Sequence, residues 1–363
     1  MQAHIGRTTH RGRRGARWLA AVVSAPAILL AACGSAGSAA STSSEGDGLS
    51  IVATTTILGD VASQLVSDAG NVSVLMPAGT DPHIFEPSAQ QLAQMQQADL
   101  IVANGANLEE HLQGPLTDAE NAGVPVFHAT DHVETLAFEG HEAEEEHAEE
   151  DEHGSEEAEH ADEGDEHSEE AGHAEETEDE HGHEEGSIDP HFWMDPTRTA
   201  DVVLALGEQI GELTGESDAV QAEANRYAGQ LADLDGEIAD TLAAIPDGER
   251  TLVTNHEAFN YFAEHYGFTI VGTVIPSLST GAEPSAHDLE ELIHTVQEQQ
   301  VRAIFAENIQ PERLAETLAQ EAGSEVQVVE LYSDSLGDEG SDAATYPDML
   351  RANARLISEV LGS

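Results

Sequence analysis

Residues 217–245 read SDAVQAEANRYAGQLADLDGEIADTLAAI and predict one long helix. Large apolar residues recur at helical spacing along one face of this segment: Leu231, Leu234, Ile238 and Leu242. Pro246 ends the pattern, because proline breaks a helix when it lies in its interior. The segment lies between two stretches of chain that both alternate strand and helix signals. We therefore expect it to connect two domains.

The stretch before this helix alternates short apolar runs with runs of helical spacing. Strands are predicted at 50–55, 71–76, 99–103 and 124–128, and helices at 57–69 and 199–214. Another helix begins at Ser88, since Gln91 three residues later completes a capping box. Apolar strands separated by helices favour a parallel sheet.

The stretch after the long helix repeats this alternation. Strands are predicted at 251–254, 269–274, 302–306 and 326–331, and helices at 257–266 and 346–361. Two further helices begin at Ser285, which is followed by Asp288, and at Pro311. The predicted fold class is therefore α/β, with two domains joined by a helix.

The charge of the chain excludes several classes of function. The 363 residues carry a formal net charge of -59, with 71 acidic residues and 12 basic residues that are all Arg. Without lysine, neither a Walker-type phosphate-binding loop nor a lysine Schiff base can form. The strong negative charge also argues against nucleic acid as a partner.

The first 32 residues are predicted to be a signal peptide. Five Arg precede an apolar run at 18–32, which is interrupted by Pro26 and is shorter than the roughly 20 residues of a membrane span. The run ends in the tetrapeptide LAAC, which is similar to a bacterial lipobox and has Cys33 as its last residue. We expect Cys33 to be lipidated and to anchor the mature chain to the membrane, with residues 33–48 as a flexible tether. As the single cysteine of the chain, it leaves no internal disulfide.

Residues 139–186 contain 25 Asp or Glu and eight His, and no apolar residue larger than Ala. Such a segment buries too little apolar surface to fold alone, so we expect it to be disordered. One hypothesis is that its histidines capture additional zinc weakly: His141, His147, His153, His160, His167, His173, His181 and His183. The alternative is a solvated acidic tether, and a count of bound zinc after deletion of the segment separates the two.

Four loops offer side chains that bind metals. In open α/β sheets, ligands bind beyond the carboxyl ends of the strands. The candidates in such loops come from both halves of the chain: His83, His191, His256 and Asp334, with Glu307 as a rival to Asp334. Three neutral imidazoles and one carboxylate form a four-coordinate shell that suits Zn²⁺. We therefore expect a zinc site in the crevice between the two domains.

Two of these candidates end the same tripeptide, Asp-Pro-His, at 81–83 and 189–191. Proline fixes its own φ and extends its predecessor, so a stiff loop directs the following imidazole. A nearby carboxylate can also hold the histidine tautomer by accepting the ring N–H. The repeat strengthens the assignment of His83 and His191.

Three motifs resemble those of the cluster A-I solute-binding lipoproteins, which bind zinc or manganese for ABC importers. They are GTDPH at 79–83, DPHFWMDP at 189–196 and TNHEAFNYF at 254–262. EPS at 283–285 and LYSD at 331–334 resemble later motifs of the same family. The motifs occur in the order of the family and span essentially the whole mature chain.

The resemblance implies two pseudo-symmetric lobes with parallel sheets, at 49–216 and 246–363, joined by one long linking helix at 217–245. The implied ligands of a single metal in the cleft are His83, His191, His256 and Asp334. Manganese-selective relatives commonly carry Glu at the third position, so His256 favours Zn²⁺ over Mn²⁺. Because imidazoles bind metal only when neutral, zinc affinity is expected to fall as the pH drops toward and below about 6.5.

The function that the resemblance implies is a zinc receptor that delivers its ion to an ABC permease and catalyses no reaction. We expect a monomer on the outer face of the cytoplasmic membrane. A zinc hydrolase is an alternative, but four protein ligands leave no position for an activated water, and the chain has no His-Glu-x-x-His. The sequence also permits a manganese receptor of the same family, and a surface zinc buffer or adhesin.

Overall fold

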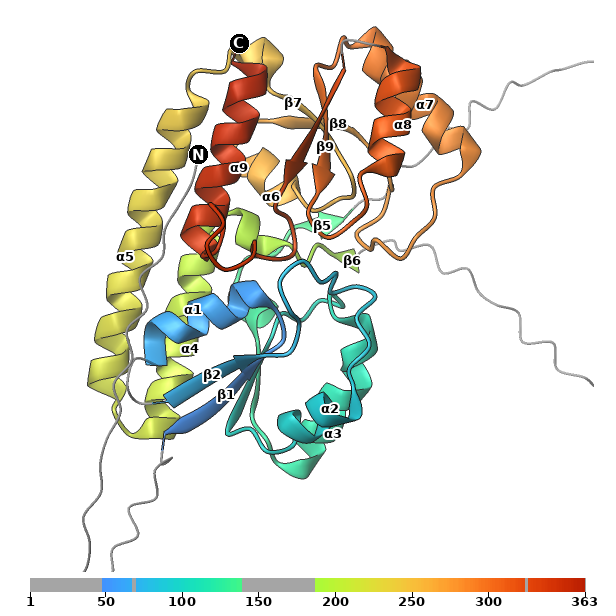
Figure 1. Cartoon of the computed structure of the whole chain (residues 1–363). Coiled ribbons are helices and arrows are strands. Elements are labelled where there is room, and N and C mark those ends of the chain that lie inside the picture. Colours follow the sequence, from blue (N-terminus) through green and yellow to red (C-terminus); the bar gives the residue numbers. More distant parts are fainter. Residues whose placement is uncertain (1–47, 67–69, 139–186, 324–325, 363) are drawn as a thin grey trace, which may run out of the picture. The chain divides into compact units, whose positions relative to one another are not determined.

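The computed structural model describes residues 48–66, 70–138, 187–323 and 326–362 (Figure 1). The signal peptide, Cys33, nearly all of the tether and the eight histidines of the acidic segment lie outside these ranges. The expectations made for them therefore stay predictions. Among the described residues, no helix is both long enough and apolar enough to cross a membrane.

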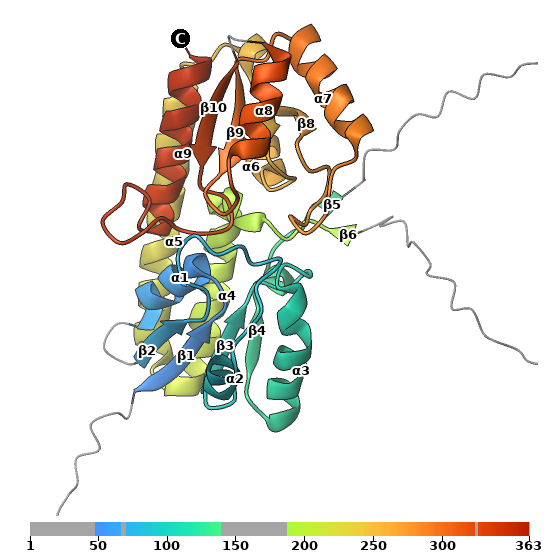
Figure 2. The same ribbon diagram turned by 45° about the vertical axis from the view of Figure 1, so that its right-hand side comes forward.

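Four parallel strands form the first sheet, in the order β2-β1-β3-β4 (Figure 2). They are β1 (Leu49–Ala53), β2 (Gly70–Val74), β3 (Leu100–Ala103) and β4 (Val126–His128). The connecting helices are α1 (Thr56–Val66), α2 (Ala89–Met95) and α3 (Gln113–Ala122). Ile51 and Ala53 share a core with α1, whereas Val52 points to the other face and packs with residues of α2 and α3. Both faces of the sheet are therefore covered.

The second sheet has the same topology as the first. Its parallel strands are β7 (Thr251–Thr254), β8 (Thr269–Thr273), β9 (Ala303–Glu307) and β10 (Gln327–Leu331). Its helices are α6 (Asn260–Tyr266), α7 (Ala286–Glu298), α8 (Arg313–Ala322) and α9 (Tyr346–Leu361). Read from β8, the strand order is β8-β7-β9-β10, which reproduces β2-β1-β3-β4 strand for strand. The two lobes are therefore pseudo-symmetric, as expected.

Two long helices and a small sheet lie between these two sheets in the sequence. The strands β5 (Ala137–Phe138) and β6 (Ser187–Ile188) pair antiparallel, and α4 (Pro196–Thr214) and α5 (Ser217–Leu242) follow. α5 is the predicted linking helix, and it packs against α4, α9 and α1. Its apolar stripe is buried in one core that includes residues of both large sheets: Leu231, Leu234, Ile238 and Leu242. The predicted α/β fold class with a linking helix is confirmed.

The helices α2 and α7 begin where their capping residues predict. Ser88 accepts a hydrogen bond from the backbone N–H of Gln91, whose side chain bonds back to the Ser88 backbone. Ser285 and Asp288 form the same reciprocal pair at the start of α7. Each pair satisfies two backbone N–H groups that have no partner within the helix. The local sequence therefore determines these two helix starts.

The predicted helix 257–266 is wrong over its first three residues, since α6 begins at Asn260. The backbone N–H of His256 donates to Glu307 Oε1 at 3.0 Å, and the backbone N–H of Glu257 donates to a carbonyl of the loop after β8 at 3.1 Å. Because these groups bond to other segments, the chain forms a turn here before the helix starts. That turn, rather than a helix end, directs the His256 side chain.

Gly207 and Gly229 give a paired test of how α4 and α5 pack. A Cβ at Gly207 of α4 would lie 2.6 Å from Ala224 Cβ of α5, whereas a Cβ at Gly229 of α5 would have no heavy atom within 4 Å. We expect Gly207→Ala to lower the free energy of unfolding by about 1–2 kcal/mol, because overpacking outweighs the gain in helix propensity. Gly229→Ala should raise it by about 0.5–1 kcal/mol. Urea denaturation measures both, and two equally stable variants would contradict this packing.

Candidate metal centre

His83 lies in the loop that leaves the carboxyl end of β2. Asp81 Oδ1 accepts a hydrogen bond from the backbone N–H of His83 at 3.0 Å. The other oxygen, Oδ2, accepts bonds from Thr280 Oγ1 and Gln310 Nε2 of the second lobe, both at 2.6 Å. The first Asp-Pro-His tripeptide therefore fixes the main chain of His83 and ties its loop to the opposite lobe.

His191 lies between β6 and α4, in the second Asp-Pro-His tripeptide. Asp189 Oδ1 accepts the backbone N–H of His191 at 2.9 Å and lies 2.7 Å from its ring Nδ1. This is the ring contact expected of a carboxylate that holds a histidine tautomer, and it leaves Nε2 to face a metal. Trp193 is buried beside this loop, and its Nε1 donates to Ser333 O at 2.9 Å. Packing of Trp193 thus supports the His191 loop.

His256 and Asp334 come from the second sheet. His256 follows β7, Asp334 follows β10, and β9 lies between these strands. Glu307, the last residue of β9, has its two oxygens 2.9 and 2.7 Å from His256 Nδ1. It is thus behind the His256 ring and outside the group of possible ligands, which contains Asp334. Between the two rival carboxylates, the geometry favours Asp334.

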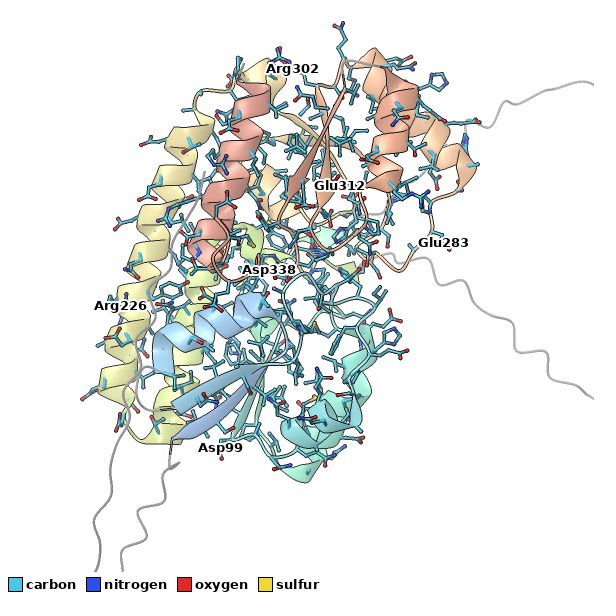
Figure 3. All side chains as sticks on the ribbon, viewed as in Figure 1. Asp99, Arg226, Glu283, Arg302, Glu312 and Asp338 are labelled. Carbon is cyan, nitrogen blue, oxygen red and sulfur yellow. The ribbon has the colours of Figure 1, made fainter. Side chains whose placement is uncertain are left out.

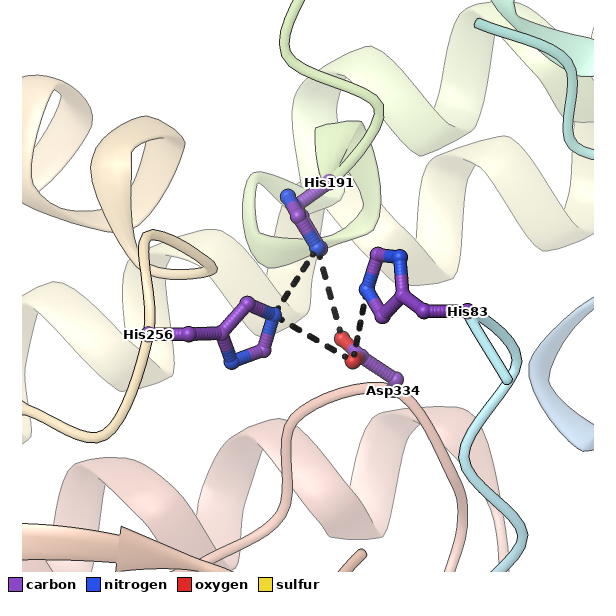
Figure 4. Close-up of side chains that lie close together, drawn as sticks. All are labelled: His83, His191, His256 and Asp334. Atoms are coloured by element: carbon purple, nitrogen blue, oxygen red, sulfur yellow. Dashed lines mark hydrogen bonds and ion pairs between the residues drawn. The ribbon is translucent and has the colours of Figure 1, made fainter. Parts of the chain in front are cut away.

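The four side chains point toward one another (Figure 4). Their ligand atoms all lie within 4.8 Å of one another. His83 Nε2 and His256 Nε2 each lie 3.4 Å from Asp334 Oδ2. His191 Nε2 lies 3.7 Å from Asp334 Oδ1 and 3.3 Å from His256 Nε2. Ligands that are about 2.0–2.1 Å from a tetrahedral zinc lie about 3.3–3.4 Å apart, so these four distances of 3.3–3.7 Å are close to the spacing around such an ion.

The site is closed to solvent. The exposed fraction is 3% for His83, 0% for His191 and His256, and 2% for Asp334, whereas charged residues such as Arg226 point outward (Figure 3). Within the described ranges, His83 Nε2 and both Asp334 oxygens have no hydrogen-bond partner. A buried carboxylate without a hydrogen-bond donor costs several kcal/mol unless positive charge lies beside it. A cation between these atoms would remove that cost.

The charges around His256 and Asp334 shift both of their pKa values. Burial disfavours protonation of the His256 ring, but the negative charges of Glu307 and Asp334 outweigh it and raise the pKa of His256 to about 9. Burial also disfavours ionisation of Asp334, but the neighbouring histidines hold the pKa of Asp334 well below its usual value. In the metal-free protein, a proton on His256 therefore supplies positive charge that a metal would replace.

Contacts between distant segments are the part of the site that the sequence does not predict. Glu307 is predicted as a rival ligand, not as the partner of His256, and Asp81 is not predicted to bond to the second lobe. One signal could identify Glu307, because it ends a strand, AIFAE, in which every residue is buried. An acidic residue at the end of a fully buried strand needs a partner.

The chain is similar to known metal-binding proteins over most of its length. Residues 51–360 match the family described as zinc-uptake complex component A, periplasmic (ZnuA). The chain is 27% identical to the manganese-binding lipoprotein MntA of Halalkalibacterium halodurans, over 92% of this chain and 94% of that protein. It is 30% identical to the zinc-binding lipoprotein AdcA of Streptococcus pneumoniae over 92% of this chain, but it spans 58% of that protein's length.

A solved structure also resembles this fold. The periplasmic zinc-binding protein TroA from Treponema pallidum matches 86% of this chain and 99% of its own, with a TM-score of 0.69 and 26% identity. Proteins named for zinc and proteins named for manganese are thus both similar to this chain. Overall similarity does not distinguish the two metals.

Zinc binding should become tighter as the pH rises from 6.5 to about 9. A protonated imidazole cannot bind metal, and the raised pKa keeps a proton on His256 through this range in the metal-free protein. At neutral pH, binding of one zinc ion should therefore release about one proton from His256. Calorimetry in buffers of different ionisation enthalpy counts the protons. Constant affinity over this range with no proton release would contradict the environment assigned to His256.

The raised pKa of His256 also affects the stability of the metal-free fold. The folded-state pKa of His256 lies above its ordinary value of 6.5, so the charged ring stabilises the fold fully below that pH. This contribution is lost as the pH rises through about 9. The melting temperature of the metal-free protein should therefore decrease as the pH rises from 6.5 to about 9. An increase over this range would contradict the prediction.

Proposed function

The chain belongs to the periplasmic zinc-uptake complex component A family, and we propose that it is an extracytoplasmic receptor that binds Zn²⁺ with high affinity and delivers it to an ABC permease. The metal is then cargo rather than a resident cofactor. Lipidation of Cys33 would hold the receptor at the outer face of the cytoplasmic membrane. The relatives named lipoproteins support this placement.

The buried group of three imidazoles and one carboxylate is the observation that carries this function. His83 and His191 come from the first lobe, and His256 and Asp334 come from the second. Four protein ligands complete a tetrahedral zinc shell, whereas zinc hydrolases keep one position for a water. The arrangement therefore supports a protein that holds a metal rather than one that activates water with it.

The donor atoms support zinc over manganese. Three of the four candidate ligands are histidines. Imidazole nitrogen suits Zn²⁺, whereas Mn²⁺ prefers carboxylate, carbonyl and water oxygens. Because relatives named for either metal are similar to this chain, the chemistry of the site is the stronger support for zinc.

The division of the ligands between the lobes gives a route for release. If the lobes moved apart, each would keep two of the four ligands, and zinc would lose half of its protein shell. A partner shifts such an equilibrium only when it binds the two states with different affinity. A permease that binds the separated lobes more tightly would therefore weaken zinc binding and accept the ion.

Replacement of His256 tests the choice of metal. The purified mature protein should hold one zinc ion tightly, and His256→Glu should shift its preference toward manganese. The substitution removes a nitrogen donor that Zn²⁺ prefers and adds an oxygen donor that Mn²⁺ accepts, so the ratio of zinc to manganese affinity should fall by at least about tenfold. Competition titrations against a chelator measure both affinities.

His294→Glu makes the same chemical change on the exposed face of α7 and should leave both affinities unchanged. If His256→Glu kept the zinc preference of the wild type, His256 would not be a metal ligand.

Growth under zinc limitation separates a receptor from a surface zinc buffer. Deletion of the gene for this protein should reduce zinc uptake through the permease. Unchanged uptake would contradict the proposal that the protein delivers zinc to the permease.

A further inference from the structure

Glu307 lies between two of the candidate ligands because of the strand order of the second sheet. The order is β10-β9-β7-β8, and Glu307 is the last residue of the central strand β9. The neighbouring strand β7 leads to His256, and the other neighbour, β10, leads to Asp334. The carboxyl ends of parallel strands meet at one edge of a sheet, so the topology places Glu307 between these two residues.

The Glu307 carboxylate contacts the segments that carry both ligands. Its Oε1 accepts the backbone N–H of His256 at 3.0 Å, and its Oε2 lies 2.7 Å from His256 Nδ1. The same Oε2 accepts the hydroxyl of Ser333, the residue before Asp334, at 2.9 Å. One side chain that is 1% exposed thus holds the main chain and ring of His256 and the loop of Asp334.

These contacts determine which ring nitrogen of His256 faces the site. A carboxylate beside Nδ1 accepts a hydrogen bond from the N–H of that nitrogen and keeps the proton on it, so the lone pair of the neutral ring is on Nε2. Nε2 is the atom that lies 3.3 Å from His191 Nε2 and 3.4 Å from Asp334 Oδ2. The negative charge behind the ring also makes Nε2 a stronger electron donor to a metal.

The first lobe also has a buried carboxylate at this edge, Glu109, but its oxygens accept the hydroxyl of Thr54 at 2.6 Å and the backbone N–H of Asn104 at 2.8 Å. The strand that matches β9 is β3, and the residue after it is Asn104, whose Nδ2 donates to Pro190 O at 3.0 Å. Asn104 thus supports the main chain before His191, whereas the carboxylate on the His191 ring comes from its own loop, at Asp189. A carboxylate held by a central strand behind a ligand ring is particular to His256.

We propose that Glu307 is a positioning residue that sets the preference of the site for zinc over manganese by orienting His256 and strengthening its Nε2 as a donor. This inference rests on the proposed zinc-binding function. A more basic imidazole favours Zn²⁺, which binds nitrogen ligands strongly, more than Mn²⁺, which prefers oxygen. Glu307 therefore acts through His256 and does not itself contact the ion.

The test is titration of Zn²⁺ and of Mn²⁺ into the mature wild-type chain and into Glu307→Gln. Loss of a partner behind a ligating histidine typically lowers metal affinity about 10-fold to 100-fold. We expect a loss of this size for zinc and a smaller loss for manganese, so the ratio of the two affinities falls. Glu330→Gln, on the exposed side of the neighbouring strand β10, is the matched control and should leave the ratio unchanged.

A double-mutant cycle separates positioning from a general effect on the fold. If Glu307 acts through His256, Glu307→Gln should cause little further loss of zinc affinity in a His256→Ala background. An equal loss of zinc affinity in both backgrounds would overturn the inference, and so would an equal loss of affinity for both metals.

Nitrogen-15 NMR of the zinc-loaded wild type gives a second readout if a variant fails to fold. It should show a slowly exchanging proton on His256 Nδ1, and an unprotonated Nδ1 would also overturn the inference.

The wild-type titrations distinguish failure of this inference from failure of the proposed function. A wild type that does not prefer zinc would contradict the function itself. A wild type that prefers zinc, together with a Glu307→Gln variant that keeps the same ratio, would overturn the role of Glu307 alone.

Discussion

Burial of the Asp334 carboxylate is the constraint on which the rest of the structure depends. Its two oxygens are removed from solvent and have no hydrogen-bond partner within the described part of the chain. Two further carboxylates, Asp189 and Glu307, are buried behind the rings of His191 and His256. Negative charges so close together in a region that is closed to solvent require positive charge among them. A divalent cation at the centre, or a proton in its absence, supplies that charge.

The fold meets this constraint by directing loops from two matching sheets to one point. The core that surrounds α5 includes residues of both sheets, so the linking helix is packed against both lobes rather than exposed between them. Beside the site, Asp81 bonds to Thr280, and Trp193 bonds to Ser333 of the opposite lobe. These bonds make the positions of His83 and His191 depend on the second lobe. Metal binding at the proposed site would therefore depend on the relative position of the lobes.

The sequence predicts the features that are determined locally. Apolar spacing and capping residues identify the strands and the starts of α2 and α7, and the Asp-Pro-His tripeptide identifies His83 and His191 because it carries its own stiff loop. The start of α6 and the place of Glu307 depend instead on which strands are neighbours, and spacing along the chain does not give that order. The pKa of His256 follows from the same contact, so the sequence alone predicts an ordinary titration near 6.5, whereas the structure raises it to about 9.

A crystal structure of the zinc-loaded mature protein, with anomalous scattering measured at the zinc edge, tests most directly whether both lobes share one ion. We expect a single strong peak in the cleft, with the Nε2 atoms of three histidines and one Asp334 oxygen at about 2.0–2.2 Å from it. The three histidines are His83, His191 and His256. A zinc ion bound by ligands of one lobe only, or one that carries a water in place of Asp334, would contradict the account.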